Sequence, residues 1–315
     1  MKKFIINDND AGQRLDKFLT KSVKNLPKNL MYKYIRLKRI KLNGKRCEIS
    51  TRLNAGDELQ LYINDEFFES PKEKSFLNVP DKINIVYEDK NIILVDKPSG
   101  LVVHEDDDNS IDTLINRIKH YLYDKKEYNP DNELSFAPSL CNRLDRNTTG
   151  IVICAKNAES LRILNQKIKD RELHKYYLCV CIGILEKKES IIKNYLFKDE
   201  KSKTVYIQKE KKPNNKQILT KYKVLKEKNN LSLLEIDLLT GRTHQIRAHL
   251  SFIGHPLLGD GKYGINRINK KYGVKTQALC SNRLTFDFKT DAGILNYLNN
   301  KTFETNTPWF VDKFF

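Results

Sequence analysis

The sequence predicts an α+β protein made of two domains. We expect a small N-terminal domain of helices and a hairpin over residues 12–64, a linker over 65–80, and a larger domain over 81–315. Near the N-terminus, apolar residues recur at helical spacing and a hairpin signal follows them. Beyond the linker, runs of strand length are mixed with few helical stretches and show no regular β-α-β order. That pattern is typical of a mainly antiparallel, mixed sheet with flanking helices.

The elements of the small domain follow from local signals. Apolar residues recur every three or four positions in two stretches, so short amphipathic helices are expected there, and Pro27 restarts the chain between them. Asn43-Gly44 lies between two short extended runs and predicts a type I′ hairpin turn. The expected helices cover 15–23 and 30–37, and a strand is expected over 59–63.

Several runs in the larger domain have the length and apolarity of strands. Helical spacing appears twice, and Thr243 is expected to cap the second of these helices. A lysine-rich polar stretch over 198–215 is predicted to be a flexible hairpin or a surface loop. The expected strands are 92–96, 151–155, 176–182, 232–239 and 277–288, and the expected helices are 161–168 and 243–252.

The positive charge of the chain is concentrated near its N-terminus. The 315 residues include 57 Lys+Arg and 40 Asp+Glu, a formal net charge of +17. Residues 14–52 contain thirteen Lys and Arg and two acids, which gives this stretch +11. A single-sign block of this density favours a polyanion-binding surface over a merely solvated basic helix. The candidate contact residues are Lys33, Arg36, Lys38, Arg39, Lys45 and Arg46.

The sequence argues against several other classes of protein and site. No apolar run is long enough to span a bilayer, and no secretory signal is expected, so a cytoplasmic protein is predicted. The six cysteines form no C-x-x-C pair and are expected to be buried reduced thiols. His244 and His249 are five apart, which suits zinc poorly, and G-x-G-x-x-G over 259–264 lacks the strand and helix of a dinucleotide site. No metal, cofactor or nucleotide is therefore expected.

Two polar segments are candidates for chemistry. In the first, Arg143 and Arg146 flank Asp145, so the carboxylate could be a nucleophile or base kept ionised by its neighbours, although aspartate in a loop is most often a turn former. The second, TGRTHQIRAHL over 240–250, reads as a cationic pocket wall or as helix capping with solvated arginines. Core packing is the default for Tyr176 and Tyr177, and stacking on a nucleobase is the alternative.

The order of helix, basic helix and hairpin over 12–64 resembles the S-four RNA-binding domain, in RLDKFL, YKYIRLKRIKLNGKR and LNAGDELQLYI. Most of the chain resembles the RluA/RluC/RluD family of RNA pseudouridine synthases, which lack a metal or nucleotide cofactor. The matching motifs are VYEDKNIILVDKPSGLVVH, NRLDRNTTGIVICAKN, KYYLCVCIG, TGRTHQIRAHLSFIGHPLLGDGKYG and QALCSNRLTF.

The resemblance implies roles for individual residues. Asp145 would be the catalytic aspartate, Arg247 its ion-pair partner, and Tyr177 the residue that stacks on the target uracil. Arg143 would fill the gap left by the flipped base, while Lys175 and Arg242 are weaker candidates for site support and phosphate contact. The sequence departs from the family at one position of this motif, where Asn142 replaces the usual histidine before Arg-Leu-Asp.

These observations favour isomerisation of specific uridines in structured RNA by an enzyme expected to be a monomer, with large-subunit (23S) ribosomal RNA as the expected substrate. A catalytically decayed RNA-binding or ribosome-assembly factor is the alternative. A glycoside hydrolase would need two carboxylates at the bond, and only Asp260 offers itself as the second. Whether Asp145 attacks the sugar or acts otherwise is left open by the sequence.

Overall fold

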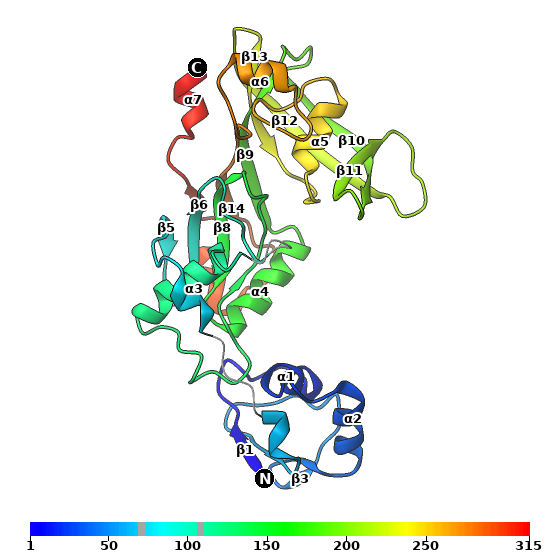
Figure 1. The fold of residues 1–315 in the computed structure, drawn as a ribbon, viewed down its shortest axis with the longest axis vertical. Helices are drawn as coiled ribbons and strands as arrows, with labels where there is room; N and C mark the ends of the chain where they lie inside the picture. The colour runs from blue at the N-terminus through cyan, green and yellow to red at the C-terminus, as the bar shows by residue number, and fades with distance from the viewer. Residues whose placement is uncertain (69–73, 106–109) are drawn as a thin grey trace.

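The computed structural model describes residues 1–68, 74–105 and 110–315. Its strands form a four-stranded sheet near the N-terminus and an eleven-stranded sheet from the rest of the chain. Figure 1 shows the small sheet and its helices at one end of an elongated molecule, with the C-terminus at the opposite end. Helices flank the large sheet, so the predicted α+β class is confirmed.

The small sheet has the strand order β1-β4-β2-β3. The predicted type I′ turn joins β2 and β3, and both of its residues have positive φ, 52° at Asn43 and 73° at Gly44. β1 lies N-terminal to the predicted stretch and pairs with β4. The elements are β1 (Lys2–Ile5), α1 (Leu15–Ser22), α2 (Lys28–Arg36), β2 (Ile40–Leu42), β3 (Lys45–Arg46) and β4 (Glu58–Leu61).

Two 3-10 helices lie between the sheets, η1 (Asp65–Phe68) and η2 (Ser75–Asn78). Phe67 and Phe68 pack against the core of the small domain. Phe76 is buried in the main core of the large domain. This segment therefore contributes aromatic side chains to both cores.

The large sheet has the order β11-β10-β12-β13-β9-β14-β8-β6-β5, with β15 beside β14 and β7 beside β8. β14 and β8 run parallel, and the other described pairs are antiparallel. The sheet is therefore mixed and mainly antiparallel, as predicted. Its strands are β5 (Ile85–Glu88), β6 (Ile92–Lys97), β7 (Ser139–Leu140), β8 (Thr149–Ala155), β9 (Leu173–Ile182), β10 (Glu189–Asp199), β11 (Thr204–Gln208), β12 (Lys216–Lys228), β13 (Leu231–Asp237), β14 (Leu279–Phe286) and β15 (Thr302–Glu304).

Alternation along the strands divides the core between the two faces of the sheet. On one face, Tyr177, Cys179 and Cys181 of β9 pack with residues of α3 and α5. On the other face, Val180 and Ile182 pack near α6 and α7, and α4 and η3 cover the β6–β8 region. The helices are α3 (Leu114–Asp124), α4 (Ala158–Lys169), α5 (Gln245–Phe252), α6 (Asn266–Lys271), η3 (Gly293–Leu298) and α7 (Trp309–Phe314).

Some local predictions were incomplete or wrong. β10 and β12 were not predicted as strands because their lysines and polar residues conceal the alternation. The stretch over 198–215 does lie in the β10–β11 hairpin and in the connection from β11 to β12. Thr243 does not cap α5. That helix begins at Gln245, and His244 is its N-cap residue without a capping side-chain hydrogen bond. The six cysteines are free thiols, and all but Cys141 are buried.

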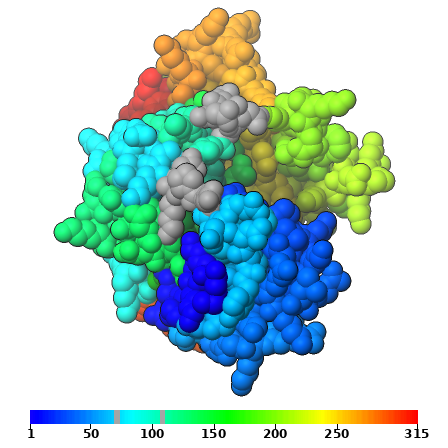
Figure 2. Space-filling view, turned by 60° about the horizontal axis from the view of Figure 1, so that its bottom comes forward, coloured from blue at the N-terminus to red at the C-terminus, as the bar shows by residue number. Residues whose placement is uncertain are grey.

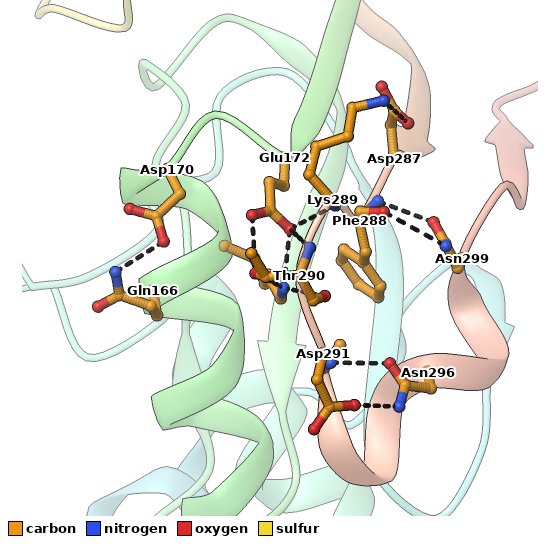
Figure 3. A network of polar contacts seen from close by, with 12 residues as sticks. Gln166, Asp170, Glu172, Asp287, Phe288, Lys289, Thr290, Asp291, Asn296 and Asn299 are labelled. Carbon is orange, nitrogen blue, oxygen red and sulfur yellow. Dashed lines mark hydrogen bonds and ion pairs between the residues drawn. The ribbon is translucent and has the colours of Figure 1, made fainter.

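A polar network fixes the segment that follows β14 (Figure 3). Glu172, at the start of β9, accepts hydrogen bonds from the backbone N–H of Lys289 at 2.9 Å and from Thr290 Oγ1 at 3.0 Å. Lys167 Nζ, from α4, lies 2.7 Å from Glu172 Oε2 and donates to the Thr290 carbonyl. Both charged side chains are almost fully buried. The pair therefore joins α4, β9 and the chain after β14.

Hydrogen bonds join the two domains, which touch along the surface visible in Figure 2. Ser135 Oγ donates to Asp10 Oδ1 and accepts from Gln13 Nε2, and Asp10 is fully buried. Burial raises the pKa of Asp10 above its usual range. The guanidinium of Arg162 in α4 donates to the carbonyl of Ala11 at 3.0 Å. These contacts set the orientation of the small domain on the large one.

Glu172→Gln is expected to destabilise the protein at neutral pH, because it leaves the buried Lys167 ammonium without its counter-charge. Hydrogen bonds, first from Lys167, lower the pKa of Glu172 from 4.5 to about 2. The pair therefore contributes its full stability above pH 4.5 and loses it as the pH falls towards 2. Urea unfolding between pH 2 and 7 should show a smaller acid-dependent loss in the variant than in the wild type. Exposed Glu159→Gln is the control, and equal pH dependence in all three proteins would contradict this role.

Candidate active site

Asp145 lies in the loop that enters β8, and a buried lysine fixes that loop. Lys97 Nζ donates to the carbonyl oxygens of Pro98, Leu101 and Arg146 at 2.8–2.9 Å. The Lys97 side chain is fully buried. Burial lowers the pKa of Lys97 to about 8, although the nearby Asp145 and Asp96 carboxylates act in the opposite direction. Lys97 therefore fixes the backbone next to Asp145 by hydrogen bonds from the protein interior.

Gly150 lets the strand after this loop approach β14. A Cβ atom at Gly150 would lie 2.3 Å from the carbonyl oxygen of Ser281, so a larger residue would force β8 and β14 apart. The side chain of Thr148, just before β8, accepts a hydrogen bond from Gln277 Nε2 at 2.7 Å. The close approach at Gly150 and the hydrogen bond to Thr148 thus fix the Thr-Thr-Gly turn. The position of Asp145, just before this turn, follows from these contacts.

Arg247, in the first turn of α5, lies between two carboxylates. Its Nη1 donates to Asp145 Oδ2 at 2.8 Å. Its Nε and Nη2 donate to the two oxygens of Asp260 at 2.7 and 3.0 Å, a bidentate geometry. Both described contacts of the Asp145 carboxylate fall on Oδ2. Within the described part of the chain, no hydrogen bond or ion pair involves Oδ1.

Asp260 is the fixed end of this arrangement. Its side chain is fully buried, and Oδ1 also accepts the backbone N–H groups of Lys262 and Tyr263 at 2.8 and 3.0 Å. Hydrogen bonds from Arg247 outweigh the effect of burial and lower the pKa of Asp260 below its usual range, while the two carboxylates raise that of Arg247. Asp260 is thus an ionised anchor without access to a sugar, which argues against it as the second acid of a glycoside hydrolase.

Tyr177 extends from β9 into the same core cluster as the neighbours of Asp145 and Arg247. Leu144 and Ile246 are buried with it, so three motifs far apart in the sequence meet through their apolar residues. Tyr177 itself is buried, and burial raises the pKa of its hydroxyl to about 12, with the Asp145 charge acting in the same direction. Its hydroxyl is therefore protonated at neutral pH.

Asn142 uses its amide within the protein. Its Oδ1 accepts the backbone N–H of Ile153 at 2.8 Å, and its Nδ2 donates to the carbonyl of Ile151 at 3.4 Å. Both partners belong to β8. The asparagine that replaces the family's usual histidine therefore supports the strand that follows the Asp145 loop.

The other predicted site residues differ in their exposure and neighbours. Arg143 and Arg242 are exposed, and Arg143 lies near His104, whose pKa is lowered mainly by burial and also by that arginine. Lys175 lies in β9 near the thiol of Cys141, and burial lowers its pKa. The six predicted contact residues of the small domain are all exposed, namely Lys33, Arg36, Lys38, Arg39, Lys45 and Arg46.

Sequence reasoning missed the residues that support the Asp145–Arg247 pair. Asp260 lies in a segment judged to be a chance G-x-G-x-x-G match, and nothing in its local pattern indicates an ion pair with a residue thirteen positions earlier. Lys97 follows an apolar strand and looks like a surface lysine. Residues 259–264 do form a turn before α6 rather than a dinucleotide site, since the chain reverses there around the buried Asp260.

Two properties of the described residues bear on ligands and location. Among residues 1–68, 74–105 and 110–315, no group of three or more His, Cys, Asp or Glu side chains could hold a metal ion. In the same part of the chain, no helix is both long and apolar enough to cross a membrane.

Comparison with known proteins extends over both domains. The profile of the RNA pseudouridylate synthase family matches residues 91–252, and the profile of the S4 domain matches residues 13–59. Among solved structures, human RNA pseudouridylate synthase domain containing 4 superposes with a TM-score of 0.57 at 21% identity. That superposition covers 73% of this chain and 90% of the human chain, and it shows a shared fold.

Curated relatives match nearly end to end. The chain is 34% identical over 312 residues to an uncharacterized RNA pseudouridine synthase of Mycoplasma capricolum, covering 98% of this chain and 99% of the relative. It is 29% identical over 296 residues to ribosomal large subunit pseudouridine synthase C of Vibrio cholerae, covering 90% and 88%. With its matching profile, fold and relatives, the chain belongs to the RNA pseudouridylate synthase family and is an isomerase with an N-terminal S-four domain.

Proposed function

We propose that this protein converts specific uridines of large-subunit ribosomal RNA to pseudouridine in the cytoplasm, with Asp145 as the catalytic aspartate. The observation that carries the proposal is the geometry of Asp145, which Arg247 holds through Oδ2 and whose charge acts on nearby Tyr177. Relatives named ribosomal large subunit pseudouridine synthase C, at 29–30% identity over most of the chain, support the ribosomal substrate.

The reaction needs little from the protein beyond one carboxylate and a shaped pocket. The N1–C1′ bond of uridine breaks, the base turns, a C5–C1′ bond forms, and the C5 proton leaves while N1 gains one. Asp145 either attacks C1′ through Oδ1 or acts as a base at the sugar or uracil. Arg247 keeps the carboxylate aligned in both routes, because its own position is set by Asp260. Tyr177 would offer its ring to the flipped uracil, and Arg143 would occupy the vacated stack.

The small domain would supply affinity for the RNA backbone. Its exposed cations lie on α2 and on the β2–β3 hairpin, and Lys38 and Arg39 extend from the turn between them. Arg39 also lies over the ring of Tyr34, at 5.3 Å, which directs its guanidinium along the surface. Docking of this domain on a stem would bring a defined loop of RNA to Asp145, because hydrogen bonds fix the two domains together.

Asp145→Asn is expected to abolish tritium release from ribosomal RNA transcripts labelled at C5 of uridine, by roughly 10³-fold or more, because an amide neither attacks C1′ nor accepts the proton. RNA affinity should stay within about twofold, since uniform binding is unchanged. Exposed Asp170→Asn is the matched control. Undiminished release by Asp145→Asn would sink the assignment, and a wild-type protein without any release would favour the decayed RNA-binding factor.

Arg247→Ala is expected to remove turnover and also to lower the free energy of unfolding by about 3–5 kcal/mol, because Asp260 is then a buried charge without a counter-charge. Arg247→Lys keeps the charge but lacks the planar guanidinium that binds two carboxylates at once. It should therefore be more stable than Arg247→Ala, while turnover drops at least about tenfold. Chemical denaturation and single-turnover tritium release measure the two effects. A stable and fully active Arg247→Lys would mean that the planar guanidinium is not needed to align Asp145.

Replacement of Arg36, Lys38 and Arg39 by glutamine should weaken RNA binding and leave single-turnover rates at saturating RNA unchanged. The slope of log affinity against log salt should fall by about 0.7–0.9 for each phosphate contact that is lost. Filter binding between 50 and 300 mM salt measures the slope. Replacement of Arg267, Lys270 and Lys271, which are exposed on α6, is the charge-matched control. Equal slopes for both triple variants would show that the small domain is not the main RNA-binding surface.

A further inference from the structure

His244 occupies an unusual position next to the candidate nucleophile. It is the N-cap residue of α5 and has φ 52°, in the left-handed region that non-glycine residues seldom adopt. Such strain is retained where surrounding contacts require it, often at functional sites. Its Nε2 lies 3.8 Å from Asp145 Oδ2, the oxygen that Arg247 already holds, and its side chain is mostly buried. The backbone conformation thus directs the imidazole at the Asp145 carboxylate.

The hydrogen bonds of Tyr263 determine which imidazole nitrogen carries the proton. The backbone N–H of Val205, in β11, donates to Tyr263 Oη at 3.0 Å. Tyr263 Oη lies 2.9 Å from His244 Nδ1, and burial raises the pKa of Tyr263, so the phenol keeps its proton. Val205 is a donor, so among the described residues His244 Nδ1 is the one hydrogen-bonded acceptor for the phenol proton; the hydroxyl therefore donates to Nδ1, and neutral His244 carries its proton on Nε2.

The charges around His244 agree with that tautomer. Asp145, from the loop before β8, faces Nε2 and favours a proton there. Arg247 of α5 and Lys262 of the turn before α6 disfavour a second proton, and buried Asp260 of that turn partly offsets them. Burial is the largest effect and lowers the pKa of His244 below its usual range. The imidazole is therefore neutral at pH 7.

We infer that His244 is a positioning residue for Asp145. The Nε2–H of His244 keeps Oδ2 of Asp145 turned away from the substrate, so that Oδ1 of Asp145 is the reacting oxygen. The inference rests on the proposed function and deepens it. Arg247 and His244 both face the same oxygen, Oδ2, so a partial turn of the carboxylate about its Cβ–Cγ bond would lengthen both contacts. The present 3.8 Å separation is longer than a hydrogen bond, and catalytic contacts of this kind tighten when substrate binds.

Tyr263 connects this positioning to the hairpin that carries β11. Its hydroxyl receives the Val205 N–H and holds the His244 ring, and its own ring lies 5.3 Å from the Arg247 guanidinium. Lys262, the residue before Tyr263, donates to the carbonyl of Lys203 at the turn of the same hairpin. The orientation of His244 is thus set by β11 as well as by its own backbone.

The test uses His244→Asn in the full-length protein. Asparagine tolerates positive φ, so the backbone is preserved, and its amide can replace Nδ1 but not the Nε2–H. The rate constant for tritium release at saturating RNA is expected to fall at least about tenfold, with KM for RNA changed less than about twofold.

A double-mutant cycle with Tyr263→Phe separates positioning from a loss of packing. The two substitutions should be strongly non-additive in rate if they act through one imidazole, whereas independent structural defects add. Additive effects, or a wild-type rate in His244→Asn while Asp145→Asn is inactive, would overturn the inference and leave the proposed function intact. A wild-type protein without tritium release would instead defeat the proposed function.

Nitrogen-15 NMR of labelled histidine tests the inference without turnover. In the wild type at pH 7, His244 should show a protonated Nε2 and an unprotonated Nδ1, because Tyr263 donates to the latter. Asp145→Asn should make His244 harder to protonate, since it removes the one carboxylate that faces Nε2. A proton on Nδ1 in the wild type, or a titration that Asp145→Asn leaves unchanged, would show that His244 does not face Asp145 as a donor.

Discussion

The site depends on one guanidinium that two carboxylates share. Asp260 is fully buried and receives four hydrogen bonds, two of them from backbone N–H groups, so it cannot turn. Arg247 is aligned by its bidentate contact with Asp260, and the remaining Nη1 fixes the Asp145 carboxylate. A buried charge is tolerated only with a compensating partner, which explains why the cation is held by two anions. The Asp145 carboxylate is thus positioned by a chain of ion pairs that begins at Asp260 in the protein interior.

Apolar packing brings the members of this chain together. Leu144 and Ile246 lie next to Asp145 and Arg247 in the sequence and are buried in the same core as Tyr177. Burial of these neighbours is favourable whatever the chemistry, so the polar residues are placed as a consequence of core formation. Lys97 completes the arrangement by donating to three carbonyl groups of the Asp145 loop and its neighbour, and the carbonyl of Arg146 also accepts the backbone N–H of Gly100.

The two domains divide the contacts with RNA that we propose. Cations of the small domain are exposed and have few protein partners, which suits a salt-dependent contact with phosphate groups. Arg247, which pairs with Asp145, is instead buried, and its guanidinium is bound by the carboxylates of Asp145 and Asp260. Hydrogen bonds between Asp10, Gln13 and Ser135 join the domains, so the distance between the docking surface and the carboxylate is a property of the fold.

The sequence by itself determined the α+β class, the basic N-terminal domain, the Asn43-Gly44 turn and most of the buried strands, because these follow from local periodicity and turn chemistry. It also indicated Asp145, Arg247 and Tyr177 as candidates. Only the tertiary structure decided that Asp260 anchors Arg247 and that His244 faces Asp145. Lysine-rich β12 was likewise recognisable only from its pairing. These features depend on contacts between distant segments, and no local pattern encodes which charges a fold brings together.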